Sequence, residues 1–474
     1  MLVSLDYEPA GSRLRGTGNR LVFLLYLALL LTDAIRKLTG LSNSIVSIVY
    51  ILVGIIYVYC LPRVWGKSRV IPRFLPLWLT LLSFWCLIVG VSQRIPVGTA
   101  LLGWVSYVFF VPLFYVGAEI MADDRRGAKA LRVVAIAGGI VGLGAIASAL
   151  LGQSAPTLLL PIIPSAGIHS SSAGNIYLSP SIFATAEEAS EQLLVALFIW
   201  IALEHLPSGR LRRVPSAVLG ILMLGGMFAA ERRTDIYVAV IGIIALVILN
   251  CTFSPSPGAR LRNRAAPRVR SRLGVTLVLA ALGAITLISF LGASRLVPFL
   301  TSGSPDGRIS LMFSATHPAA LTGQGPGTST QGIGLTGGNS FFAINNQGPY
   351  TGYLLDGRDF ITAEGGLTKT WLELGIVGVV LYAGVFWSVL GPAVRALRRL
   401  DVAGRALFIL TVALGILFLK GHQSLDNPLV QPLYWLAAGG IWGRMRALEI
   451  SQQQSEMTTP VFSSRASIPR SHVG

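Results

Sequence analysis

Apolar runs of spanning length, separated by polar or charged stretches, recur along the whole chain. Crossing the hydrocarbon core of a bilayer takes about 20 mostly apolar residues in a helix, because every backbone N–H and C=O must be bonded internally. Such runs lie near residues 19–35, 44–62, 74–92, 98–119, 131–151, 189–206, 214–230, 234–251, 273–292, 371–391, 405–420 and 428–443. The pattern predicts an all-α polytopic membrane protein with about twelve transmembrane helices.

Two polar stretches between these runs are too long to be simple connectors. One lies near 152–188, and the other spans 293–370, between the ninth and tenth runs. The second is rich in Gly, Ser, Thr and Asn, and residues 323–327 read Gly-Gln-Gly-Pro-Gly. Such a segment is ordered only when it packs on the bundle or folds around a ligand, so we expect function in this large external loop region.

The basic residues predict the orientation, because Lys and Arg resist translocation and stay cytoplasmic. With the N-terminus inside, most of the 38 Lys and Arg become cytoplasmic, including six arginines between 260 and 272. The predicted organisation is a cytoplasmic tail (1–18), spans one to nine (19–292), the external region (293–370), spans ten to twelve (371–443) and a disordered cytoplasmic tail (444–474).

The amino-acid composition is typical of a membrane protein and argues against several other functions. The chain is 53% hydrophobic and 12% charged, whereas soluble domains carry about twice that share of charge. Its net charge of +17 is spread between apolar runs and forms no aromatic-laced patch, so no nucleic-acid partner is predicted. The three cysteines, five histidines and glycine-rich segment match neither metal-ligand spacing nor a Walker lysine motif. We therefore expect no metal, no cofactor and no ATP-driven pump.

Adjacent arginines in a tight external turn are the first candidates for chemistry. Arg232 and Arg233 lie between two spans and are partly screened by Glu231 and Asp235. Arginine offers a fixed fork of donors suited to phosphate oxygens, and its charge counts for more at the edge of a low dielectric. The alternative is that both side chains anchor a helix end by snorkelling.

The large loop and the helix starts supply the remaining candidates. Arg308 and His317 lie early in the loop, and Glu364, near its end, is a candidate general base or a merely solvated carboxylate. Glu187 opens the sixth span, where the helix dipole favours a carboxylate. Glu373 falls at the outer edge of the tenth span, where it either caps the helix or pairs.

Several of these segments occur in the order found in a known superfamily. They are 183–201 entering a middle helix, Ala229 to Val240 around Arg233, Gly307-Arg308 followed by 323–327, and the Glu-Leu-Gly segment at 372–378. Over roughly 180–390 the chain resembles the O-antigen ligase and Wzy-type polysaccharide polymerase superfamily of bacterial membrane glycosyltransferases. Ligases carry a His-Asn or His-Ser pair where this chain reads Glu364-Gly365. The resemblance therefore favours a polymerase over a ligase.

The resemblance implies metal-independent glycosyl transfer at the external face of the bacterial inner membrane. Its expected donor is an undecaprenyl-diphosphate-linked oligosaccharide, with membrane lipid and chain-length-regulating or export proteins as partners. Arg232, Arg233 and Arg308 would hold the diphosphate, and Glu364 with Arg233 would be catalytic. His317, Lys369 and Glu187 are further candidate substrate-binding residues of the same site.

Two other functions share this topology. A transporter or flippase of lipid-linked sugars would show mid-span polar groups and broken helices, whereas the runs here read as mostly featureless. A non-catalytic export subunit would tolerate the loss of Arg233, Arg308 and Glu364. Both alternatives remain open at this point.

Overall fold

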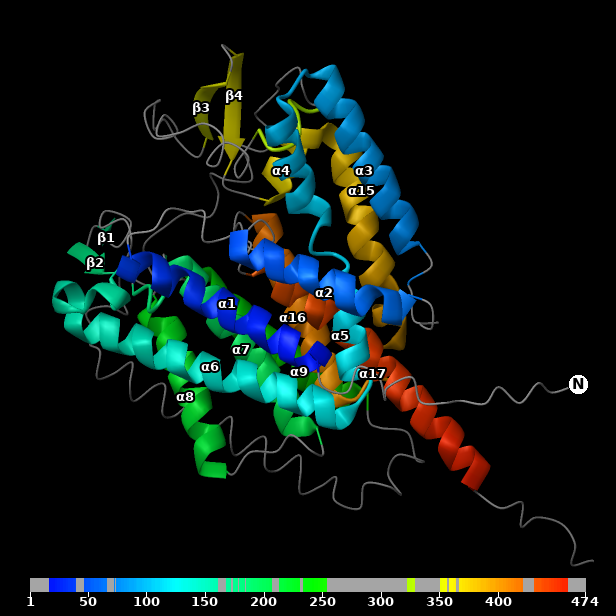
Figure 1. Cartoon of the computed structure of the whole chain (residues 1–474). Coiled ribbons are helices and arrows are strands. Elements are labelled where there is room, and N and C mark those ends of the chain that lie inside the picture. Colours follow the sequence, from blue (N-terminus) through cyan, green and yellow to red (C-terminus); the bar gives the residue numbers. More distant parts are fainter. Residues whose placement is uncertain are drawn as a thin grey trace, which may run out of the picture.

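The computed structural model describes residues 17–39, 47–65, 72, 74–160, 168–171, 174–177, 179–183, 185–206, 213–230, 233–253, 322–328, 350–355, 358–363, 366–420 and 430–458. Its long helices form a bundle accompanied by two short antiparallel hairpins (Figure 1). Five helical segments are long and apolar enough to cross a membrane: Leu75–Ser92, Val97–Met121, Asp124–Ser154, Thr234–Thr252 and Gly366–Ala396. Three shorter apolar helices accompany them, so the bundle is compatible with a multi-pass membrane protein.

The predicted apolar runs coincide with helices, except that the ninth, 273–292, lies outside the described residues. The helices are α1 (Thr17–Thr39), α2 (Ser47–Trp65), α3 (Leu75–Ser92), α4 (Val97–Val108), α5 (Leu113–Met121), α6 (Asp124–Leu151), α7 (Ala186–His205), α8 (Arg213–Ala229), α9 (Arg233–Thr252), α15 (Gly366–Ala396), α16 (Val402–Lys420) and α17 (Gln431–Thr458). Two 3-10 turns, η3 (Gly152–Ser154) and η4 (Thr157–Leu159), follow α6.

Three helix boundaries differ from the prediction. The run 98–119 is divided into α4 and α5, and the interruption contains Pro112, which lacks a backbone N–H. Helix α6 begins at Asp124 instead of 131, because the Asp123 carboxylate accepts from the Arg125 N–H and the Arg126 N–H and caps the helix. Helix α17 continues past 443 to Thr458, so the prediction of a disordered tail from 444 is wrong for residues 444–458.

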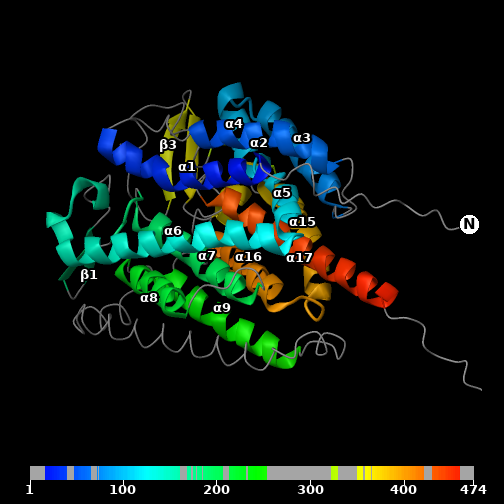
Figure 2. The ribbon, with the colours of Figure 1, turned by 60° about the horizontal axis from the view of Figure 1, so that its bottom comes forward.

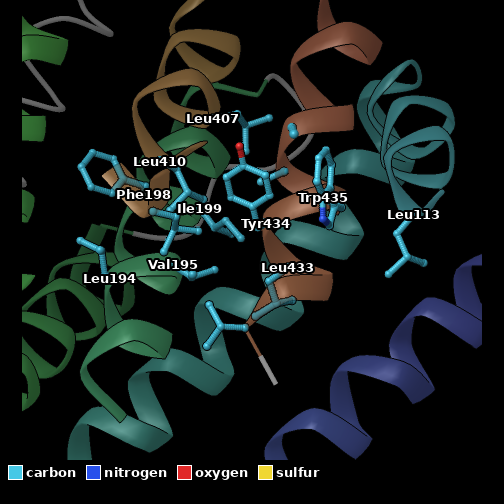
Figure 3. Packing of buried hydrophobic residues seen from close by; sticks show 14 of the residues in the cluster. Leu113, Leu194, Val195, Phe198, Ile199, Leu407, Leu410, Leu433, Tyr434 and Trp435 are labelled. Carbon is cyan, nitrogen blue, oxygen red and sulfur yellow. The ribbon is translucent and has the colours of Figure 1, made fainter. Parts of the chain in front are cut away.

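The core of the bundle centres on α7. All side chains from Ala189 to Leu203 of this helix are buried, including the polar Ser190, Glu191 and Gln192. Burial is expected for residues 193–203, which are apolar on every face. Figure 3 shows Val195 and Phe198 of α7 beside Leu410 of α16 and Tyr434 of α17. Helix α6 packs on α8 and α7 and lies between α1 and α8 (Figure 2).

Two short hairpins interrupt the polar segments. Strands β1 (Ile168–Ser171) and β2 (Gly174–Tyr177) pair between η4 and α7, and β3 (Tyr350–Leu355) and β4 (Arg358–Ala363) pair just before α15. The expected external regions, 152–188 and 293–370, therefore contain some regular structure. Figure 1 shows β3 and β4 beside α4.

An ion-pair network marks one end of the bundle. Arg444 of α17 pairs with Asp124, the first residue of α6, and with Asp401, just before α16. Helix α6 begins at this network and α15 ends near it. The end of α6 and the start of α15 therefore lie a helix length away from it. We call this network the Arg444 end. The end of α6 with β1 and β2, and the start of α15 with β3 and β4, lie apart in Figure 1 and are together called the loop end.

Candidate functional site

Helix α15 is broken near its start. Gly375 has φ 64° and ψ −170°, a conformation essentially restricted to glycine, and it separates a first segment, Gly366–Leu374, from the rest of the helix. The break exposes carbonyl groups that an intact helix would bond internally. Those of Leu372, Glu373 and Leu374 accept hydrogen bonds from Gln324 N–H, Gly325 N–H and the Trp85 indole N–H, at 2.7, 3.0 and 2.8 Å.

Residues 322–328, here called the glycine loop, thus cap the break and also pack against the helix hairpin α3–α4. Gly323, Gly325 and Gly327 all have positive φ. The approach to α4 is closest at Gly327, where a Cβ atom would lie 2.1 Å from the Thr99 carbonyl oxygen. A Cβ on Gly103 would likewise lie 2.0 Å from the Gly327 nitrogen. The loop is therefore ordered by packing on the bundle, and glycine is required on both sides of this contact.

A buried polar cluster lies where α4, the first segment of α15 and the start of α17 meet. We call Ser106, Tyr107, Lys369, Glu373 and Gln431 the Ser106 cluster. Lys369 Nζ donates to Ser106 Oγ at 3.2 Å and lies 5.1 Å from the centre of the Tyr107 ring. The Tyr107 hydroxyl donates to Glu373 Oε2 at 2.9 Å, and Gln431 Nε2 donates to the Ser106 carbonyl at 2.8 Å.

The Ser106 cluster is almost completely shielded from solvent. Relative exposure is 1% for Lys369 and 0% for both Glu373 and Gln431. Taking charged groups out of water is expensive unless hydrogen bonds and opposite charges compensate, and the cluster supplies both kinds of group. Glu373 therefore bonds to Tyr107 inside the bundle, in line with the second of the two roles predicted for it.

Sequence reasoning missed Ser106, Tyr107 and Gln431. Ser106 and Tyr107 lie inside an apolar run, and Gln431 is the first residue of α17. A polar pair within an otherwise apolar span was the available signal, since such residues are expected to face the interior of a bundle. The apolar runs therefore contain more polar groups that face the interior of the bundle than we expected from the sequence.

A second polar group surrounds the start of α7. Lys37 Nζ, near the end of α1, donates to the carbonyl oxygens of Leu158 and Ser181 at 3.1 and 3.0 Å. Thr185 and Glu188 form a reciprocal capping box at the first turn of α7. These contacts tie the segment after α6 to α1 and α7. They support the predicted role of carboxylates at this helix start.

The predicted site residues fall in different places. Arg233 is the first residue of α9, Glu187 lies half-buried in the first turn of α7, and Lys369 belongs to the Ser106 cluster. Arg232, Arg308, His317 and Glu364 lie outside the described residues. Within the described ranges, no group of three or more His, Cys, Asp or Glu side chains is arranged to hold a metal ion.

The site belongs to a helical bundle compatible with a multi-pass membrane protein, with a broken helix and a buried polar cluster near one end. Comparison of the chain with protein-family models, curated proteins and solved structures finds no match.

Proposed function

We propose that this chain polymerises lipid-linked oligosaccharide repeat units for a bacterial exopolysaccharide, capsule or O-antigen, at the external face of the inner membrane. One structural observation supports the proposal in addition to the resemblance. The glycine loop and the Glu-Leu-Gly segment are far apart in the sequence, yet backbone hydrogen bonds join them at the break in α15. Two of the segments on which the resemblance rests therefore contact each other at one end of the bundle.

The proposed topology has twelve spans with both termini cytoplasmic. The loop end would then face outward, and the Arg444 end would lie in the cytoplasm with Arg125, Arg126 and Arg446. Arg233, as the first residue of α9, would lie at the external face, where the helix N-terminus adds a favourable field for an anion.

In the proposed reaction, a hydroxyl of the acceptor sugar attacks the anomeric carbon of the donor. The bond from that carbon to the diphosphate oxygen breaks, and undecaprenyl diphosphate leaves with the electron pair. Arg233, Arg232 and Arg308 stabilise the charge on the departing diphosphate, and Glu364 takes the proton from the hydroxyl. His317, Lys369 and Glu187 contribute to substrate binding, while the polyprenyl tail stays in the membrane.

Polysaccharide gels from cells carrying variant proteins test this function. Arg233→Ala and Glu364→Ala should abolish long chains and leave single repeat units at normal membrane levels, and Arg233→Lys should retain little activity because lysine cannot form a bidentate phosphate contact. Arg94→Ala is the matched control, since Arg94 is an exposed arginine in the turn between α3 and α4. Wild-type chain lengths in both alanine variants would refute the polymerase assignment.

A transporter or flippase of lipid-linked sugars is the second candidate, favoured by one specific observation. The break in α15 and the buried Lys369 and Glu373 beside it are features expected of transporters. Liposomes containing the protein and lipid-linked repeat units separate the two functions, because a flippase moves the sugar across the bilayer without lengthening it.

The same gels address the remaining alternatives. Loss of a ligase leaves long chains on the lipid carrier, whereas a non-catalytic export subunit tolerates both alanine substitutions.

A further inference from the structure

Among the described residues, only one of the two polar groups of the Gln431 side-chain amide has a hydrogen-bond partner. Its Nε2 donates to the Ser106 carbonyl, and this bond orients the amide. Within the described part of the chain, its Oε1 is buried and has no hydrogen-bond partner. A buried acceptor without a donor costs about 1–3 kcal/mol, so a group that supplies a donor is expected at this position.

A second incompletely bonded atom lies one helical turn further along α17. Among the described residues, Trp435 Nε1 is also buried without a hydrogen-bond partner. Residues i and i+4 share one face of a helix, so an unsatisfied acceptor and an unsatisfied donor follow each other on the same face. Figure 3 shows Trp435 on α17, where it stacks on Phe386 of α15 with ring centres 5.9 Å apart.

Ser106 brings this acceptor close to a cation. Lys369 donates to the Ser106 hydroxyl, and Gln431 donates to the carbonyl of the same residue. Aromatic rings continue along the seam between α4, α15 and α17, from Tyr107 through Tyr382 and Phe386 to Trp435. An ammonium donor and an amide acceptor suit sugar hydroxyls, and neighbouring aromatic rings offer apolar faces for the C–H groups of a sugar.

We propose that Gln431 and Lys369, held by Ser106, bind two adjacent hydroxyl groups of the acceptor sugar. Gln431 Oε1 accepts a hydrogen bond from one hydroxyl, and Lys369 Nζ donates to the oxygen of the next. A fully ionised diphosphate has no proton for Gln431 Oε1, so the site selects the sugar and not the anionic part of the substrate. This inference rests on the proposed polymerase function and adds Gln431 and Ser106 to its substrate contacts.

The position of these residues fits a ligand that enters from the loop end. Gln431 is the first residue of α17, and Lys369 lies in the first turn of α15. The glycine loop is bonded to the same segment of α15, at Leu372 and Glu373, three and four residues after Lys369. The acceptor would therefore bind beside the start of α15.

The test measures competition by a soluble probe on the full-length protein in liposomes. The substrate is the lipid-linked repeat unit extracted from the cells of origin, and the probe is the same oligosaccharide released from its lipid by mild acid. Because the probe lacks the diphosphate, it reports on sugar contacts. Gln431→Met should raise the probe concentration that halves polymerisation about 3- to 10-fold, the loss expected for one hydrogen bond.

Two further variants keep the test decisive. Ser106→Ala should shift inhibition in the same direction, because it removes the hydroxyl that orients Lys369, and it replaces Gln431→Met if that variant fails to fold. Thr411→Val is the control, since it removes a buried hydroxyl that donates to the Leu407 carbonyl of its own helix, α16. Thermal melting of each protein separates folding from binding.

The outcomes distinguish the two proposals. No polymer from the wild-type protein would refute the polymerase function and this inference with it. An active wild type with an inactive Arg233→Ala variant, combined with unchanged inhibition in Gln431→Met, would overturn the sugar site alone. That result would mean that only water satisfies Gln431 Oε1.

Discussion

Gly327→Ala tests whether the glycine loop stabilises the broken helix. The new methyl group would lie 2.1 Å from the Thr99 carbonyl oxygen and 3.0 Å from the Gly103 nitrogen. Both are backbone atoms of α4, so no side-chain rotation relieves the overlap. The φ of 81° at this position adds a second penalty.

The expected loss of stability combines these two effects. A left-handed conformation costs a non-glycine residue roughly 1–2 kcal/mol, and overpacking a filled interior costs about 1–3 kcal/mol. The sum is about 2–5 kcal/mol. Displacement of the loop would also release the carbonyls of Leu372 and Glu373 at the break, so a loss of polymer is expected even where the protein reaches the membrane.

The assay is thermal unfolding of the detergent-solubilised protein, followed by size-exclusion chromatography of a fluorescent fusion. Gly415→Ala is the control, because a Cβ at Gly415 in α16 meets no atom within 4 Å and alanine favours a helix by up to about 1 kcal/mol. Gly103→Ala should resemble Gly327→Ala, since it fills the same contact from the other side. If the melting temperature of Gly327→Ala equalled those of the wild type and the control, the capping role of the loop would be refuted.

Three other predictions concern the break, the Arg444 end and the orientation. Gly375→Ala should lower both melting temperature and polymer formation, because alanine cannot adopt φ 64° with ψ −170° and α15 would have to straighten; unchanged values would show that the break is dispensable. Arg444→Ala should destabilise the protein by about 1–3 kcal/mol, the loss expected for hydrogen bonds to charged groups, and by more than Arg446→Ala, whose partner lies 3.8 Å away; equal melting temperatures would contradict this. Alkaline phosphatase should be active when fused after Leu160 and inactive after Thr458, and the reverse would invert the proposed topology.

The sequence alone predicted the helices well, because a spanning helix satisfies its own backbone and its apolar length is a local property. Its errors lie at the ends of helices. Charged residues between 124 and 132 and beyond 443 were read as loop or tail, although they continue α6 and α17. Capping by Asp123 sets the start of α6, and the ion pairs of Arg444 with Asp124 and Asp401 hold α17 on the bundle where its apolar run ends; neither contact is visible in hydropathy.

The polar interior was decided only by tertiary structure. Tyr107, Lys369, Glu373 and Gln431 lie in or beside apolar runs of the sequence, and any of them could face lipid, solvent or a partner. Packing brings them together from α4, α15 and α17, where burial makes each hydrogen bond obligatory. The glycine-rich run at 323–327 was recognisable from composition, but its role as the cap of a broken helix depends on carbonyl groups that only the folded α15 presents.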